Sequence, residues 1–128
     1  MRVSHGFDAF FGQYLRTALW SSTDESTPEG GEPLDRNYTT ADIAPESLEL
    51  ARRDCRDFYD SYAHLWYDDD GDDGDAGHNF WLTRNRHGAG FWDGDYPTNG
   101  AELTRLAHAY GECDPIVGDD GLIYLYDG

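Results

Sequence analysis

One stretch of the sequence combines large aromatic residues with arginines, histidines and glycines, and it decides the expected fold: Gly77-His78-Asn79-Phe80-Trp81-Leu82-Thr83-Arg84-Asn85-Arg86-His87-Gly88-Ala89-Gly90-Phe91-Trp92-Asp93. Residues 80–83 and 90–92 are largely apolar, and between them lies Asn85-Arg86-His87-Gly88, a sequence typical of a tight turn. The pattern predicts a β-hairpin over residues 77–93. Each strand places apolar residues at adjacent positions, so we expect both faces of this hairpin to be partly covered.

Immediately before this stretch lies the most acidic run of the chain, Asp68-Asp69-Asp70-Gly71-Asp72-Asp73-Gly74-Asp75. It follows a segment in which apolar residues recur every three or four positions, which predicts a helix over about residues 45–67. Pro45 suits the first position of that helix. Aspartates at the negative end of a helix dipole do not prolong the helix comfortably, so residues 68–76 are expected to form a solvated, flexible loop.

The flanking segments supply the remaining elements. A 3.6-residue apolar period predicts a helix over about residues 5–20, with Ser4 as its N-cap, and a shorter one over about 100–111, with Asn99 and Glu102 as a capping box. Residues 21–37 are rich in glycine, proline and acids and are expected to be a flexible loop. Residues 115–117 and 122–126 flank a glycine-aspartate turn and predict a second hairpin.

These elements predict a single domain over residues 1–128. Its expected class is α+β, with about three helices packed on a small antiparallel sheet made of two β-hairpins.

The charge of the chain is extreme. Its 128 residues carry 26 acidic and 9 basic side chains, a net charge of −17, and every basic residue is an arginine. Such a field repels nucleic acid and anionic membranes and attracts basic surfaces, so we expect neither direct nucleic acid binding nor membrane association. The N-terminus lacks the apolar run of a signal peptide, and Cys55 and Cys113 are expected to be buried, reduced thiols. The predicted location is therefore the cytoplasm of the host cell.

Metal and catalytic patterns are weak. Asp68, Asp70 and Asp72 match the first three ligands of an EF-hand, but the positions that should hold glycine and glutamate hold Asp73 and Asn79. The histidines and cysteines include no close ligand pair such as HxxxH or CxxC. A general base at His87 is conceivable, yet no nucleophile motif and no phosphate-binding glycine loop accompanies it. The sequence therefore predicts no catalytic residue, no metal site and no cofactor.

Two segments of the chain resemble a known family. They are Tyr14-Leu15-Arg16-Thr17-Ala18-Leu19-Trp20-Ser21-Ser22-Thr23-Asp24 and the stretch of residues 77–93 quoted above, and the similarity runs from about Phe10 to Tyr124. The family consists of small acidic proteins of bacteriophages and mobile elements, mostly without assigned function, with the motif GH-x-FWLTRN-x-HGAGFWD. This chain has Asn79 and Arg86 where the family pattern more often has an acid and a glycine. The resemblance implies a phage or mobile-element setting and no catalytic residues.

The surplus of acid leads to the main functional hypothesis. Duplex DNA is held largely through its phosphates, and a folded protein that fixes carboxylates at comparable spacing competes for the same groove. With the phage setting, this predicts an anti-defence inhibitor (anti-CRISPR or anti-restriction) that acts as a DNA mimic on a basic host DNA-binding complex. A merely solvated surface and adaptation to high salt are the alternatives. The expected partner-binding row comprises Asp54, Asp57, Asp60, Asp68, Asp69, Asp70, Asp72, Asp73 and Asp75.

A second hypothesis assigns the function to the aromatic and arginine-rich hairpin instead. A non-enzymatic phage accessory protein would then recognise its partner through the polar turn of this hairpin and the tryptophans beside it. The residues of this alternative site are Trp81, Arg84, Arg86, His87 and Trp92.

Overall fold

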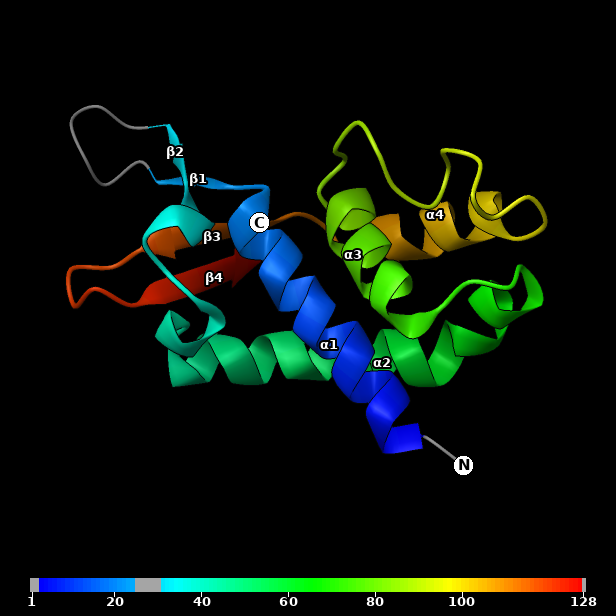
Figure 1. Ribbon diagram of the computed structural model, residues 1–128, viewed down its shortest axis with the longest axis horizontal. Coiled ribbons are helices and arrows are strands. Elements are labelled where there is room, and N and C mark those ends of the chain that lie inside the picture. The colour runs from blue at the N-terminus through cyan, green and yellow to red at the C-terminus, as the bar shows by residue number, and fades with distance from the viewer. Residues whose placement is uncertain (1–2, 25–30, 128) are drawn as a thin grey trace.

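Four α-helices and two short antiparallel sheets make up the part of the chain that the structure describes, residues 3–24 and 31–127 of a computed structural model (Figure 1). The helices are α1 (Val3–Trp20), α2 (Pro45–Asp68), α3 (Asp73–Arg84) and α4 (Gly100–His108). The sheets pair β1 (Thr23–Asp24) with β2 (Glu32–Pro33) and β3 (Cys113–Val117) with β4 (Ile123–Asp127). The predicted α+β class is confirmed, with one helix more than expected among the described residues.

Helices α1 and α2 follow the sequence prediction closely. The predicted inner face of α1 is buried along its whole length, from Phe7 to Leu19. The helix begins at Val3, so Ser4 lies inside it and does not precede it as an N-cap. Helix α2 starts at Pro45, as predicted, and buries a stripe that includes Ala51, Cys55 and Phe58.

Helix α3 corrects the hairpin prediction, because residues 77–84 are helical and residues 85–99 form an irregular segment. The error has a physical cause. Nearly every residue from Ala76 to Arg84 is buried, so the helix has no polar face and no amphipathic period to reveal it. It lies directly against α1, and a Cβ atom at Gly77 would stand 2.0 Å from the carbonyl oxygen of Phe10. Glycine at this position lets the two helix backbones approach each other.

Aromatic rings from α1, α2, α3 and the segment after α3 form a continuous core. Phe58 of α2 stacks on Phe80 of α3 with ring centroids 4.1 Å apart, and Phe10 of α1 stacks on Trp66 of α2 at 5.3 Å. Phe91 completes the stack 6.0 Å from Phe58. Burial of a phenylalanine side chain contributes about 1.5–3 kcal/mol, so this stack fixes how the helices pack.

The β3–β4 ribbon confirms the second predicted hairpin, with Val117 paired to Ile123 and Gly118 N donating to Leu122 O. Its backbone is tied to the helices on both edges. Cys113 N donates to Asn85 Oδ1 just after α3, and Leu125 N donates to Ser47 Oγ at the start of α2. Ala44 N donates to Ile123 O, and Pro115 on β3 has no N–H to offer. These features leave little edge for pairing with another strand.

The described part of the segment between α1 and α2 contains short regular elements where the sequence predicts a loop over residues 21–37. The β1–β2 pair and the 3-10 turn η1 (Leu34–Arg36) lie within its described part, while residues 25–30 fall outside the described residues. A second 3-10 turn, η2 (Thr40–Asp42), carries a capping box between Thr39 and Asp42. The capping box predicted for α4 is absent, because the Asn99 side chain donates instead to Leu65 O.

Candidate functional site

Five exposed aspartates meet at one end of the molecule, which we call the acidic end. Four come from the junction of α2 and α3, and one comes from the segment before α4: Asp68, Asp70, Asp72, Asp75 and Asp95. In Figure 1 the turn after α2 and the segment before α4 lie together at the right-hand end, away from the two sheets. Within the described chain, no arginine forms an ion pair with any of these five carboxylates.

The acidic run of residues 68–75 is not the continuous loop that the sequence predicts. Asp68 is the last residue of α2, residues 69–72 form the connection, and α3 starts at Asp73. The Asp72 carboxylate accepts from Asp75 N at 2.7 Å and caps α3. Aspartate suits this end of a helix, where the dipole and the free N–H groups favour negative charge. The run therefore ends one helix and starts the next.

Two aspartates of the run are used by the fold. The buried Asp73 carboxylate accepts from Trp66 Nε1 at 3.1 Å and from the Tyr67 hydroxyl. Burial and the hydrogen bond to Asp73 raise the pKa of Tyr67 above its usual value. The Asp69 carboxylate accepts from Thr98 N and Asn99 N, at 2.9 and 2.8 Å. Desolvation opposes the charge of Asp69, but these amide bonds outweigh it and lower the pKa of the carboxyl.

Asp69 also explains how Asp95 joins the acidic end. Its two bonds hold the segment before α4 against the α2–α3 junction, and the ring of Tyr96 packs beside Gly71. Partial burial, followed by the charge of Asp72 and a smaller contribution from Asp95, raises the pKa of Asp75. Negative charge is thus concentrated here. Sequence reasoning missed Asp95, whose only signal was its place in a short acidic turn, and its proximity depends on the tertiary fold.

The three aspartates predicted on α2 already have partners. Asp54 Oδ2 lies 3.1 Å from Arg84 Nη1, Asp57 accepts from the Tyr110 hydroxyl, and Asp60 pairs with Arg56 at 3.3 Å. Beside them, the guanidinium groups of Arg52 and Arg56 lie over the rings of Phe11 and Phe7, at 4.7 and 4.4 Å. The structure therefore separates Asp54, Asp57 and Asp60 from the acidic end and does not extend them into one row of unpaired carboxylates.

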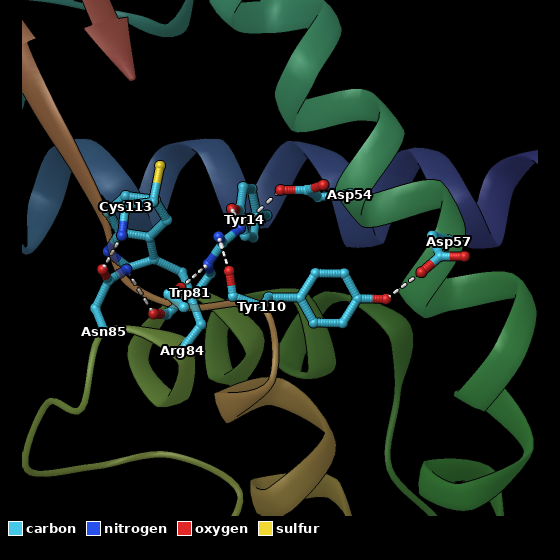
Figure 2. A network of polar contacts seen from close by, with 9 residues as sticks. Tyr14, Asp54, Asp57, Trp81, Arg84, Asn85, Tyr110 and Cys113 are labelled. Carbon is cyan, nitrogen blue, oxygen red and sulfur yellow. Dashed lines mark hydrogen bonds and ion pairs between the residues drawn. The ribbon is translucent and has the colours of Figure 1, made fainter. Parts of the chain in front are cut away.

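The alternative site is divided by the fold. Trp81 and Arg84 are 1% exposed, whereas Arg86, His87 and Trp92 lie on the surface. Figure 2 shows Arg84 between Tyr14, Asp54 and the backbone of Tyr110. Its Nε donates to Gly111 O at 2.8 Å, and Trp81 Nε1 donates to Ser21 Oγ at 2.8 Å. Two of the five residues thus belong to the core.

The groups around Arg84 compensate for the burial of its positive charge. Burial alone would lower the pKa of Arg84, but the neighbouring Tyr14, Cys113 and Asp54 more than offset this and raise it. Burial raises the pKa of Tyr14 and that of Cys55, which also lies beside the charge of Asp54. Cys55 and Cys113 are both buried thiols that are not joined in a disulfide. The network holds α1, α2 and α3 to the segment that leads into β3.

Helices α2 and α3 end in the same backbone motif. Gly71 N donates to Trp66 O and Asp70 N to Tyr67 O after α2, while His87 N donates to Leu82 O and Arg86 N to Thr83 O after α3. This is the Schellman motif, in which one residue adopts the left-handed conformation that favours glycine. Here that residue is Asp70, with φ 62°, or Arg86, with φ 58°. Each helix therefore ends with a charged residue at a position where the backbone conformation favours glycine.

Within residues 3–24 and 31–127, no group of three histidine, cysteine, aspartate or glutamate side chains is arranged to hold a metal ion. In the same residues, no helix has both the length and the apolar character needed to cross a membrane.

Searches of protein-family models, of curated proteins and of solved structures find no match to this chain. The resemblance to small phage proteins therefore stays a prediction, and the functional argument depends on the geometry of the chain itself.

Proposed function

We propose that the protein is a non-enzymatic, phage-encoded or mobile-element-encoded inhibitor of a host defence complex, and that it acts as a DNA mimic through its acidic end. The observation that carries the proposal is the set of five exposed carboxylates at one end, none of them paired with an arginine of the described chain. Its partner is a basic DNA-binding surface, such as that of a CRISPR surveillance complex or a restriction enzyme.

Electrostatics supports this use of the acidic end. The net charge of −17 steers the molecule toward any cationic groove, and steering of this kind raises association rates steeply at low ionic strength. A DNA-binding groove presents cations that release counterions when phosphates enter it. Carboxylates held on helix ends supply negative charge to such a groove without further ordering of the chain, because Asp72 and Asp69 already fix the junction.

Asp70 adds a second argument. A glycine at this left-handed position would fold more favourably, since a non-glycine residue there is held at a sterically disfavoured angle. Local rules broken in this way concentrate at functional sites. An exposed carboxylate at the acidic end is what a charge-based contact requires.

The experiment is a gel shift of a CRISPR surveillance complex or a restriction enzyme on its DNA, at low salt, with and without excess protein. Loss of DNA binding is the expected result. A variant that changes all five acidic-end aspartates to asparagine should lose inhibition, and the Asp72→Asn change within it keeps a side-chain oxygen that can cap α3. The matched control neutralises five other exposed acids: Glu46→Gln, Glu49→Gln, Glu112→Gln, Asp114→Asn and Asp119→Asn.

Both variants have the same net charge of −12, because five negative charges are removed from −17. If the two variants lose inhibition equally, general charge and not the acidic end is responsible. If neither loses it, or if the wild-type protein leaves DNA binding unchanged on every complex tested, the DNA-mimic proposal is wrong.

The exposed remainder of the alternative site supports one competing function. Trp92 is 54% exposed. Arg86, six residues before it, is an exposed residue just after the end of α3. Partner recognition through this surface would be lost in a double variant, Arg86→Ala with Trp92→Ala, whereas inhibition through the acidic end would survive it.

A further inference from the structure

A surface hollow of about 330 Å³ lies between α1, η1 and α3, apart from the acidic end. None of the five acidic-end residues lines it. Its walls are polar and aromatic side chains of the types that bind small ligands: Gln13, Arg16, Thr17, Trp20, Asp35 and His78. Its volume is at the lower end of the range for small-molecule sites.

A chain of hydrogen bonds organises one wall of the hollow. Arg16 Nη2 donates to Gln13 Oε1 at 3.2 Å, and Gln13 Nε2 donates to Thr17 Oγ1 at 3.2 Å. Thr17 is 1% exposed, and its hydroxyl lies 2.9 Å from His78 Nδ1. Because Thr17 occupies Nδ1, the imidazole keeps Nε2 for a further partner. Four polar side chains are thus fixed relative to one another across two helices.

Trp20 forms the aromatic part of the site. It is 58% exposed, in contrast to the aromatic rings of α1 that face the core, and its ring centroid lies 5.8 Å from that of His78 with an interplanar angle of 41°. An exposed indole beside an arginine is the kind of surface on which planar ligands stack. Nothing in the aromatic core requires Trp20 at this place.

Gly12 gives Arg16 its position. A Cβ atom at Gly12 would stand 3.3 Å from Arg16 Nη1, so the guanidinium lies back over the glycine toward Gln13. Arginine and histidine donors that line a hollow together with an aromatic ring suit a phosphate or carboxylate group. The exposed Asp35 carboxylate of η1 also lines the hollow and accepts hydrogen bonds only, which suits a hydroxyl or an amine.

We infer that this hollow binds a planar aromatic compound that carries a phosphate group, of the class of nucleoside monophosphates. The base stacks on Trp20, the phosphate accepts from Arg16 and from His78 Nε2, and Asp35 accepts from a sugar hydroxyl or an exocyclic amine. The single phosphate is bound by local donors and not by the overall field, which repels long nucleic acids. This site is independent of the proposed inhibition and goes beyond it.

The test is titration of the full chain with adenosine 5′-monophosphate, followed by calorimetry and tryptophan fluorescence. Adenosine and inorganic phosphate serve as separate probes. We expect saturable binding of the monophosphate, with each half-ligand at least about tenfold weaker. If adenosine binds as tightly as the monophosphate, Arg16 and His78 do not bind the phosphate. If inorganic phosphate binds as tightly as the monophosphate, Trp20 does not stack on the base. Either result, or no saturation at millimolar ligand, overturns the inference.

Variants locate the binding. Trp20→Ala and Arg16→Gln should each weaken it at least about tenfold, as removal of a stacking ring or of a charge-assisted bond does. Their matched controls are Trp92→Ala, with a similarly exposed indole, and Arg53→Gln, with an exposed arginine that makes no ion pair within the described chain. If the controls weaken binding as much as the site variants, the ligand binds elsewhere and the inference fails.

Gly12→Ala gives a finer test. Alanine favours the helix, so the fold is kept, but the new methyl group lies 3.3 Å from Arg16 Nη1 and the guanidinium must shift by a few tenths of an ångström. Weaker binding with unchanged or higher thermal stability supports the site, and unchanged binding shows that Gly12 does not set the position from which Arg16 binds the ligand. The acidic-end variant with five asparagines should bind the monophosphate at least as well as the wild type, so this inference and the proposed function can fail separately.

Discussion

The ends of helices α2 and α3 share one backbone motif, yet the chain uses them differently. After α2, only two residues separate a left-handed Asp70 from the start of α3, and several carboxylates lie at the junction. After α3, a left-handed Arg86 leads into a long irregular segment that returns along the protein to the same junction. We call these two regions the α2 end and the α3 end.

The comparison separates what folding needs from what it tolerates. At the α3 end the last helical residue, Arg84, is buried and hydrogen-bonded to several groups, while Arg86 is exposed. At the α2 end Asp73 is buried and bonded, while Asp70 and Asp75 are exposed. Residue type alone does not distinguish these fates. Charges that remain after the fold has used what it needs are those available for binding.

The largest expected effect is at the α3 end, in Arg84→Met. The change leaves Asp54, the Tyr14 hydroxyl and two backbone carbonyls without their shared donor. Breaking a buried ion pair by removing one partner costs about 3–5 kcal/mol, and because Asp54 keeps some contact with water we expect about 3 kcal/mol. The measurement is the free energy of unfolding in urea.

Arg86→Met is its matched control, since it removes the same group two residues away at the surface. It should change the free energy of unfolding by no more than about 0.5 kcal/mol. Equal losses in the two variants would mean that the buried network does not stabilise the fold beyond the general value of a positive charge.

The second prediction concerns Tyr96, where the α3 end packs on the α2 end. Burial raises the pKa of Tyr96 to about 12, although the hydrogen bond from Asn79 opposes this shift. A raised pKa contributes stability that is complete below the unfolded value near 10 and is lost as pH rises through the folded value. Between pH 10 and pH 12 the wild type should therefore lose on the order of 2–3 kcal/mol through this group.

Tyr96→Phe should remove that part of the alkaline loss. Chemical denaturation at pH 8 and again near pH 11.5 measures it, and the variant should lie closer to the wild type at the higher pH. The difference at pH 8 reports the lost bond to Asn79. A constant difference at both values would show that Tyr96 ionises alike in the folded and unfolded protein.

Asp73 and Asp75 provide the third comparison, within the acidic run itself. Asp73→Asn replaces a buried carboxylate that accepts from Trp66 and Tyr67, and hydrogen bonds to charged groups contribute about 1.5–3 kcal/mol. We expect a loss of about 2 kcal/mol. Asp75→Asn should cause no loss, because partial burial and the nearby Asp72 already disfavour its charge. A loss at Asp75 as large as at Asp73 would mean that the run acts as one structural unit.

Much of the fold could be predicted from the sequence, because α1, α2 and α4 are amphipathic and β3–β4 has a clear turn. Helix α3 could not, since nearly every residue from Ala76 to Arg84 is buried and no apolar period is left, and its glycines and Asn79 suggest a turn or strand instead. The sequence Asn85-Arg86-His87-Gly88 does turn the chain, but as the end of a helix. The turn signal was right and the element before it was wrong.

The candidate site was predicted in part. The sequence located the negative charge but did not show which carboxylates stabilise the fold. Asp69 accepts from a residue that is distant in sequence, and the partner of Asp73 becomes visible only once α2 and α3 pack. Trp81 and Arg84 were expected at a surface because their partners, too, become visible only once the helices pack. Asp95 and the Trp20 hollow depend on contacts between separate segments, which no local pattern records.

The smallest effects test the shared motif directly, through Asp70→Gly and Arg86→Gly. Glycine relieves a left-handed residue of about 1 kcal/mol, and somewhat less at Asp70, since aspartate tolerates this conformation better than arginine. Both variants should therefore unfold at higher urea concentration than the wild type. A loss in either would mean that the side chain makes a stabilising contact that outweighs the backbone gain.

Salt then divides the backbone effect from the charge effect. Asp70→Gly changes the net charge from −17 to −16, and Arg86→Gly changes it to −18. Screening shortens from about 10 Å near 0.1 M salt to about 3 Å near 1 M, so self-repulsion matters chiefly at the lower concentration. The gain at Asp70 should shrink as salt rises, and the gain at Arg86 should grow. If the gain in stability is independent of salt in both variants, the acidic end exerts no net repulsion on the fold. Its charge would then not be unfavourable for folding.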